Sequence, residues 1–170
     1  VRKTVYRVIR GDYSIVRKYR EKYDKVIAIV DTSGSMLKYS LWTIASLAAI
    51  LPIVKAIVLF SDTVRVFKPP KKSFTQLALR YLEQVFSSGF KGYTNISLAL
   101  REAGKLASGS DVAIVLTDLE QTVRDTEPWI EVQSLLKRKC KRMIFIVPPE
   151  HRDDVAERIK SSGGEVVVVE

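Results

Sequence analysis

The chain has 170 residues, 46% of them apolar, which suffices for one compact domain with a continuous core. No run approaches the roughly 18 uninterrupted apolar residues of a membrane-spanning helix, and the first residues lack the apolar stretch of a secretion signal. We therefore expect no membrane span. Cys140 is the only cysteine, which excludes an internal disulfide and a multi-cysteine zinc site and favours a cytoplasmic protein.

The net charge of +9 is distributed unevenly along the chain. Residues 1–25 carry nine Lys and Arg against three acidic residues, and five more cations lie within residues 137–142. Residues 117–131 instead carry five acidic residues against one arginine. Such asymmetry bears on partners rather than on fold, and we expect a basic and an acidic face. We interpret residues 1–24 as a basic N-terminal extension and residues 25–170 as the folded domain.

Secondary-structure signals are weak before residue 25, where two extended segments around Gly11 and Asp12 are favoured, although the apolar spacing also suits one helix face. Beyond it, short apolar runs rich in β-branched residues alternate with helical patterns. The expected strands cover residues 26–30, 56–60, 112–116, 143–147 and 166–169. The expected helices cover residues 41–51, 75–86, 96–106, 129–140 and 153–160.

This alternation predicts a doubly wound α/β domain, because parallel strands need long crossover connections and those connections are helical here. The central sheet should be mostly parallel, with helices on both faces. Residues 62–67 follow the strand at 56–60 too closely for a helical crossover. We therefore expect them to form one antiparallel edge strand.

Two of the expected central strands run directly into aspartates, Asp31 and Asp118, and such sheets place ligand-binding residues at the carboxyl ends of their strands. The first strand continues into DTSGSM, which adds the hydroxyls of Ser33 and Ser35. Mg²⁺ prefers about six oxygen ligands and usually retains water, and two carboxylates with hydroxyls and waters can supply them. The sequence therefore indicates a site for a hard cation.

The DTSGS segment matches the Asp-x-Ser-x-Ser signature of von Willebrand factor A (VWA) domains, and residues 25–170 resemble that family and the related integrin inserted domains. The resemblance implies a VWA/Rossmann-like fold with a metal-ion-dependent adhesion site, or MIDAS. Thr94, in GYTNISLAL, and Asp118, in VLTDLE, fall where the family has its remaining ligands. By this resemblance the carboxylates act largely through coordinated water. The implied ligands of Mg²⁺ or Mn²⁺ are Asp31, Ser33, Ser35, Thr94 and Asp118.

Each of these residues also has a simpler structural interpretation. Ser33 or Ser35 could cap the helix that follows, Thr94 could cap the helix that begins near Asn95, and Asp118 could only stabilise a turn. The complete set in the correct order favours the metal site over these alternatives.

The arginine-rich beginning resembles the intracellular VWA proteins similar to carbon monoxide dehydrogenase accessory proteins, which commonly work beside MoxR-type AAA+ ATPases. We therefore predict a metal-dependent protein-binding module in a complex-assembly or AAA+ ATPase-associated system, and not an enzyme. The protein partner should supply an acidic side chain to the metal. We expect specificity to come from the rim loops around Leu37, Tyr93 and Leu119, where Leu119 replaces the glycine of many relatives.

Two other functions stay open. A pI near 9.7 and the related domains of Ku and Ro ribonucleoproteins suggest nucleic-acid binding, although basic character alone is weak evidence. A metal-dependent phosphohydrolase would use Asp31 as its nucleophile. Haloacid-dehalogenase-like phosphatases want a second Asp two residues later, where this chain has Ser33, and neither a P-loop nor a GxSxG motif is present. Catalysis is therefore disfavoured.

Overall fold

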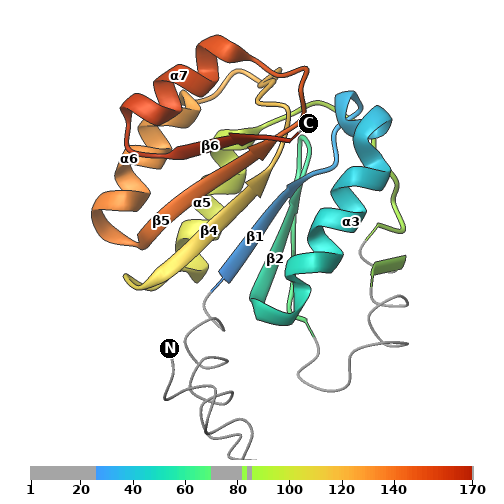
Figure 1. Ribbon diagram of the computed structural model, residues 1–170, viewed down its shortest axis with the longest axis horizontal. Helices are drawn as coiled ribbons and strands as arrows, with labels where there is room; N and C mark the ends of the chain where they lie inside the picture. The colour runs from blue at the N-terminus through green and yellow to red at the C-terminus, as the bar shows by residue number, and fades with distance from the viewer. Residues whose placement is uncertain (1–25, 70–81, 84–85, 170) are drawn as a thin grey trace, which may run out of the picture.

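The structure, a computed structural model, describes residues 26–69, 82–83 and 86–169 (Figure 1). The expected N-terminal extension and its two extended segments lie outside the described residues. So does most of the helix expected at residues 75–86, of which Leu82 and Glu83 are helical.

One six-stranded sheet organises the described residues, with the strand order β3-β2-β1-β4-β5-β6. Every neighbouring pair is parallel except β2 and β3, which are antiparallel. The predicted mostly parallel sheet with one antiparallel edge strand is therefore confirmed. The strands are β1 (Val26–Asp31), β2 (Val54–Phe60), β3 (Val64–Phe67), β4 (Asp111–Leu116), β5 (Cys140–Val147) and β6 (Glu165–Val168).

Helices cover both faces of the sheet, as Figure 1 shows. Alternate residues of β1 divide between two cores: Ile27 and Ile29 join the cluster under α5, α6 and α7, whereas Ala28 and Val30 join the cluster under α3. This two-sided burial explains the uninterrupted apolar run of β1. The helical elements are η1 (Ser35–Tyr39), α3 (Ser40–Ile50), η2 (Leu51–Ile53), α5 (Ile96–Leu106), α6 (Pro128–Arg138) and α7 (Asp153–Ser161).

The boundary between α6 and β5 differs from the expected one. Pro128 opens α6 as predicted, but the helix ends at Arg138 and Cys140 already belongs to β5. A buried Cys140 suits the apolar side of either element. Its pairing with Asp111 of β4 places it in the strand, and this contact between residues far apart in the chain is not visible in the local pattern.

The helical stretch from Ser35 to Ile53 is long and apolar enough to cross a membrane, by length and composition only, within the part of the chain that the structure describes. Its buried residues Met36, Leu47 and Leu51 pack in the interior of the domain. The core helix of a folded domain can be as long and apolar as this stretch, although such a helix is mostly buried and this one is not. We therefore interpret α3 as a covering helix of the sheet that leaves its outer side, including Leu41, exposed.

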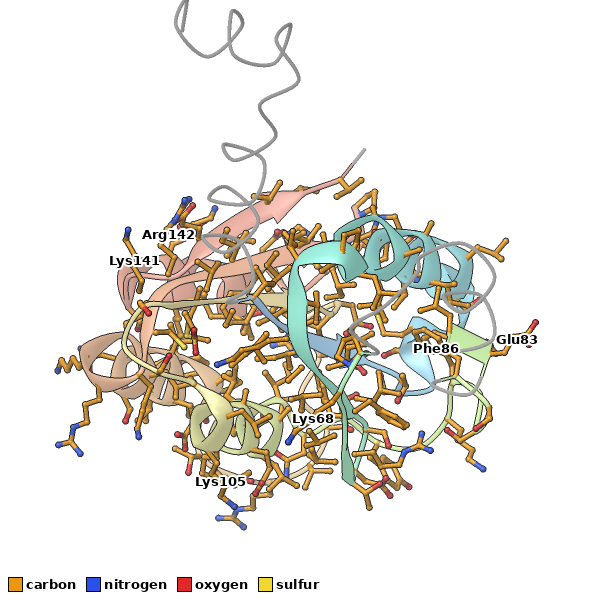
Figure 2. All side chains as sticks on the ribbon, turned by 90° about the horizontal axis from the view of Figure 1, so that it is seen from below. Lys68, Glu83, Phe86, Lys105, Lys141 and Arg142 are labelled. Carbon is orange, nitrogen blue, oxygen red and sulfur yellow. The ribbon has the colours of Figure 1, made fainter. Side chains whose placement is uncertain are left out.

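One basic cluster and one acidic segment lie at opposite ends of the parallel sheet. Lys141 and Arg142 project from the start of β5, and Lys105 from the end of α5 (Figure 2). The acidic segment of residues 117–131 begins instead where β4 ends. The basic cluster of residues 137–142 therefore lies at the amino ends of the strands, and the acidic segment begins at the carboxyl end of β4.

Candidate metal centre

The site lies where the sheet changes winding direction, because β1 has β2 on one side and β4 on the other. In open α/β sheets, ligands bind outside the carboxyl ends of the strands at such a switch point. Asp31 is the last residue of β1, and Asp118 follows β4 by two residues. The topology thus brings both predicted carboxylates to one edge of the sheet.

The Asp31 side chain is fully buried, and both of its oxygens accept hydrogen bonds. Ser33 N donates to Oδ1 at 2.9 Å, and Thr117 Oγ1 donates to Oδ2 at 2.7 Å. Burial raises the pKa of Asp31 to about 7, against these hydrogen bonds, which lower it, and the neighbouring Asp118 adds to the rise. A nearby cation would stabilise the charged form of this carboxylate.

The two serine hydroxyls of the loop lie together, with Ser33 Oγ and Ser35 Oγ 3.2 Å apart. Neither caps a helix, since Gly34 is the N-cap residue of η1 and no side chain caps it. Gly34 has φ −63°, an ordinary helical value, so the turn of this loop does not depend on glycine. The capping interpretation is wrong for both serines.

A second loop brings Thr94 to the first. Gly34 N donates to Gly92 O at 3.1 Å, which joins the two loops through their backbones. Gly92 has φ +88°, in the left-handed region that favours glycine, and an added Cβ would lie 3.3 Å from Asp62 Oδ1. The conformation therefore favours glycine two residues before Thr94, whereas the contact would require only a small shift of the Asp62 side chain.

Thr94 does not cap α5, because Asn95 is the N-cap residue and its Oδ1 accepts from Leu98 N at 2.9 Å. The Thr94 backbone is held on both sides instead. Thr94 N donates to Thr122 Oγ1 at 2.8 Å, and Thr94 O accepts from the amides of Thr122 and Val123 at 3.0 and 3.1 Å. Among the described residues, Thr94 Oγ1 has no hydrogen-bond partner and remains available to a ligand.

Asp118 does stabilise a turn, since its Oδ1 accepts from Glu120 N at 3.1 Å. Its backbone carbonyl accepts from Arg152 N at 3.1 Å, which ties the loop after β4 to the start of α7. The other carboxylate oxygen, Oδ2, is without a hydrogen-bond partner in the described part of the chain. The turn interpretation and a role as metal ligand are therefore compatible.

Leu119 does not lie on the rim, contrary to the prediction. Its side chain is fully buried in the core cluster under α5, α6 and α7, and its φ is +64°. This positive φ suits the glycine of many relatives. Here it turns the leucine inward, so the Leu119 side chain packs in the core beneath the loop that carries Asp118. Leu37 and Tyr93 are exposed, as expected.

The donor set suits a hard cation. The described residues include no group of three or more His, Cys, Asp and Glu side chains arranged to hold a metal, so an ion here would depend on hydroxyls and water beside two carboxylates. Thr94 and Asp118 each offer an oxygen that no described hydrogen bond uses. Ser35 and Asp118 also line a pocket of about 580 Å³, which opens the edge to solvent.

Two supporting threonines were not assigned a role from the sequence. Thr117 orients Asp31, from which it is 86 residues distant, and Thr122 holds Thr94 across 28 residues. Thr117 stands beside Asp118, so its position at the end of a central strand was a usable signal. No local pattern around Thr122 reveals its contact.

The sequence matches the family described as VWA domain containing CoxE-like protein over residues 3–167. The chain belongs to this CoxE-like VWA family. The family match begins at residue 3 and so includes most of the expected N-terminal extension. No curated protein matches the sequence of this VWA domain significantly.

Solved structures of VWA type share its fold. The conserved hypothetical protein BatB from Bacteroides thetaiotaomicron is similar at 15% identity and TM-score 0.63, over 85% of this chain and 89% of that one. A von Willebrand factor type A protein from Catenulispora acidiphila is similar at 19% identity and TM-score 0.63, over 85% and 38%. Proximal thread matrix protein 1 from the mussel byssus, described with a zinc-occupied MIDAS motif, is similar at 18% identity and TM-score 0.64, over 85% and 43%. This VWA domain thus spans only about two fifths of the last two chains.

Proposed function

We propose that this VWA domain binds a divalent cation, Mg²⁺ or Mn²⁺, and uses it to bind a protein partner that supplies an acidic side chain. One observation carries the proposal: the loops after β1 and β4 and the loop before α5 meet at the switch point, where Asp118 Oδ2 and Thr94 Oγ1 are free of hydrogen bonds among the described residues. The proposed ligands, directly or through water, are Asp31, Ser33, Ser35, Thr94 and Asp118.

The preference for an acidic partner follows from the charge of the site. Asp31 is buried behind the serine loop with both oxygens hydrogen-bonded, so it acts mainly by orienting that loop and through water. The hydroxyls of Ser33, Ser35 and Thr94 are neutral, so among the proposed ligands only Asp118 offers the cation a carboxylate oxygen that no described hydrogen bond uses. A cation held in this way keeps much of its charge on the solvent side, and a carboxylate gains more by replacing water there than a neutral amide does.

We propose binding rather than catalysis because of the environment of Asp31. A nucleophilic carboxylate needs a free oxygen facing the substrate, whereas both oxygens of Asp31 accept hydrogen bonds and the side chain is fully buried. The position two residues later, where a phosphatase would carry its general acid, is Ser33. Panels of phosphatase and nucleotidase substrates should give no turnover that Asp31→Asn removes.

The CoxE-like family match supports a cellular setting for the proposal. We propose that the domain works in the cytoplasm, where its single buried Cys140 remains reduced, as part of a complex-assembly system with a MoxR-type AAA+ ATPase. Co-purification of tagged protein with such an ATPase in Mg²⁺, and its loss in EDTA, is the expected result. An ATPase complex that is unchanged in EDTA would contradict the metal-dependent part of this proposal.

Calorimetric titration of Mn²⁺ and Mg²⁺ tests the site directly. Asp118→Ala should abolish measurable binding while the thermal unfolding midpoint falls by only a few degrees, because the one described side-chain hydrogen bond that is lost, from Glu120 N, is part-buried and lies in a loop. Glu157→Gln, which changes an exposed acid on α7, is the matched control and should bind as the wild type does. Equal affinity in wild type and Asp118→Ala would remove Asp118 from the site.

A further inference from the structure

The three most exposed large apolar side chains among the described residues lie on or next to the segments that carry the candidate metal ligands. Leu41 is 83% exposed, Tyr93 69% and Leu37 60%, whereas no other exposed large apolar side chain exceeds 50%. Scattered single apolar residues on a surface need no explanation, but a group beside a binding site marks a contact surface. We call Leu37, Leu41 and Tyr93 the apolar rim.

The apolar rim is built from the same loops as the site. Leu37 is two residues after Ser35 in η1, and Leu41 lies about one helical turn further on, at the start of α3. Tyr93 directly precedes Thr94, and its loop is joined to the serine loop by the hydrogen bond from Gly34 N to Gly92 O. Leu37 also lines the pocket together with Ser35 and Asp118. A ligand that enters this pocket to reach the metal therefore contacts Leu37, and Tyr93 and Leu41 belong to the adjoining segments.

Other residues that line the pocket carry charges that are already paired. Lys38 contacts Glu150 in an ion pair, and Arg152 makes two hydrogen bonds to Asp154, at 2.9 and 2.8 Å. His151 Nδ1 lies 2.9 Å from Pro148 O. A charged group of a partner would have to compete with these internal partners, and paired, exposed charges add little to affinity. These residues would therefore add little to the affinity for a partner that places a basic residue here.

A second acidic residue would be repelled. Glu120 lines the same pocket as Asp118, is exposed and, among the described residues, is in no ion pair. A carboxylate bound to the metal is compensated by the cation, but the next carboxylate along the ligand would face Glu120. The pocket thus accommodates one acid at the metal.

Resting on the proposed function of the site, we propose that this surface recognises a protein segment with a single Glu or Asp flanked by apolar residues. The acid binds at the metal, and the flanking apolar side chains pack on Leu37, Leu41 and Tyr93. Segments with clustered acids, or with polar residues around the acid, are discriminated against. The metal supplies the attraction common to all acidic ligands, and the apolar rim supplies the selectivity.

Three fluorescent peptides of equal length test this proposal in the presence of Mn²⁺, with a central Glu flanked by Leu, by Ser or by Glu. We expect the Leu-flanked peptide to bind roughly tenfold more tightly than the Ser-flanked one, since partial burial of one leucine supplies about that much. The Glu-flanked peptide should bind more weakly than either. The double variant Leu37→Ser, Leu41→Ser should lose the preference for Leu while its Mn²⁺ affinity by calorimetry stays unchanged.

Val66→Ser is the matched control, because Val66 is 45% exposed on the edge strand β3 and belongs to no part of the site. It should retain the preference. Equal affinities for the Leu-flanked and Ser-flanked peptides, tightest binding of the Glu-flanked one, or an unchanged preference in the double variant would overturn the proposal while Mn²⁺ binding stands. Absence of Mn²⁺ binding by the wild type would instead overturn the proposed function, and the inference with it.

Discussion

Thr122 is the residue whose substitution best separates the geometry of the site from the stability of the fold. Its Oγ1 accepts the 2.8 Å hydrogen bond from Thr94 N, and Val has nearly the same shape without the acceptor. Thr122→Val leaves the Thr94 N–H without this partner, which costs about 1 to 3 kcal/mol for a buried donor. Because this contact is only part-buried, water can replace the hydroxyl in part, and we expect about 1 kcal/mol.

That cost should appear as a small loss of folding stability and, because Thr94 must then be ordered when the metal binds, also as a loss of metal affinity. The amides of Thr122 and Val123 still donate to Thr94 O in the variant, so the two loops stay joined. The Thr94 N–H loses its partner, so the Thr94 backbone is held less firmly in place. A loss of about 1 kcal/mol corresponds to roughly a fivefold weaker Mn²⁺ affinity. Calorimetric titration measures this change, and the thermal unfolding midpoint should move by only a few degrees.

Thr122→Ser is the control, since serine restores the acceptor oxygen without the methyl group. It should bind Mn²⁺ within a factor of two of the wild type. Unchanged affinity in Thr122→Val, or equal loss in the Ser and Val variants, would refute the view that this hydroxyl positions Thr94.

Three further predictions concern stability and pH. Leu119→Ala should lower the free energy of unfolding by about 2 to 4 kcal/mol in a denaturant titration, because the side chain is fully buried, and a loss below about 0.5 kcal/mol would contradict that burial. Burial raises the pKa of Asp31 to about 7, so the metal-free folded state holds a proton that the unfolded state releases near pH 4. The stability contributed by protonated Asp31 should therefore fall as pH rises from about 4 through 7, and in EDTA the pH dependence of unfolding should flatten over that range in Asp31→Asn. Arg101 forms ion pairs with Asp125 and Glu131 but is about one-third exposed, so Arg101→Ala should cost roughly 1 kcal/mol on unfolding, and no cost would show that these pairs contribute nothing.

Much of the fold could be predicted from the sequence because the central strands have simple requirements. β1 and β4 are buried on both faces, so they need short β-branched runs, and helical crossovers between them leave a parallel sheet as the natural arrangement. The positions of Asp31 and Asp118 at one edge follow from that topology. The mostly parallel sheet and its antiparallel edge strand are confirmed.

The details that failed depend on contacts between distant residues or on backbone angles. Leu119 looks like a surface residue because it follows an aspartate in a loop, and its positive φ directs the side chain into the core. Thr94 resembles a helix cap, but the neighbouring Asn95 takes that role and leaves the Thr94 hydroxyl free of hydrogen bonds among the described residues. The support of Thr94 by Thr122 arises from two loops that meet only after folding.

Anomalous diffraction from crystals of this domain grown or soaked in millimolar Mn²⁺ tests the central claim most directly. We predict one strong anomalous peak outside the carboxyl ends of β1 and β4, within coordination distance of the Ser33 and Ser35 hydroxyls. The same peak should be absent from crystals of Asp118→Ala. A wild-type map without a peak at this position, or with its strongest peak held by other residues, would contradict the proposal that these loops form a metal centre.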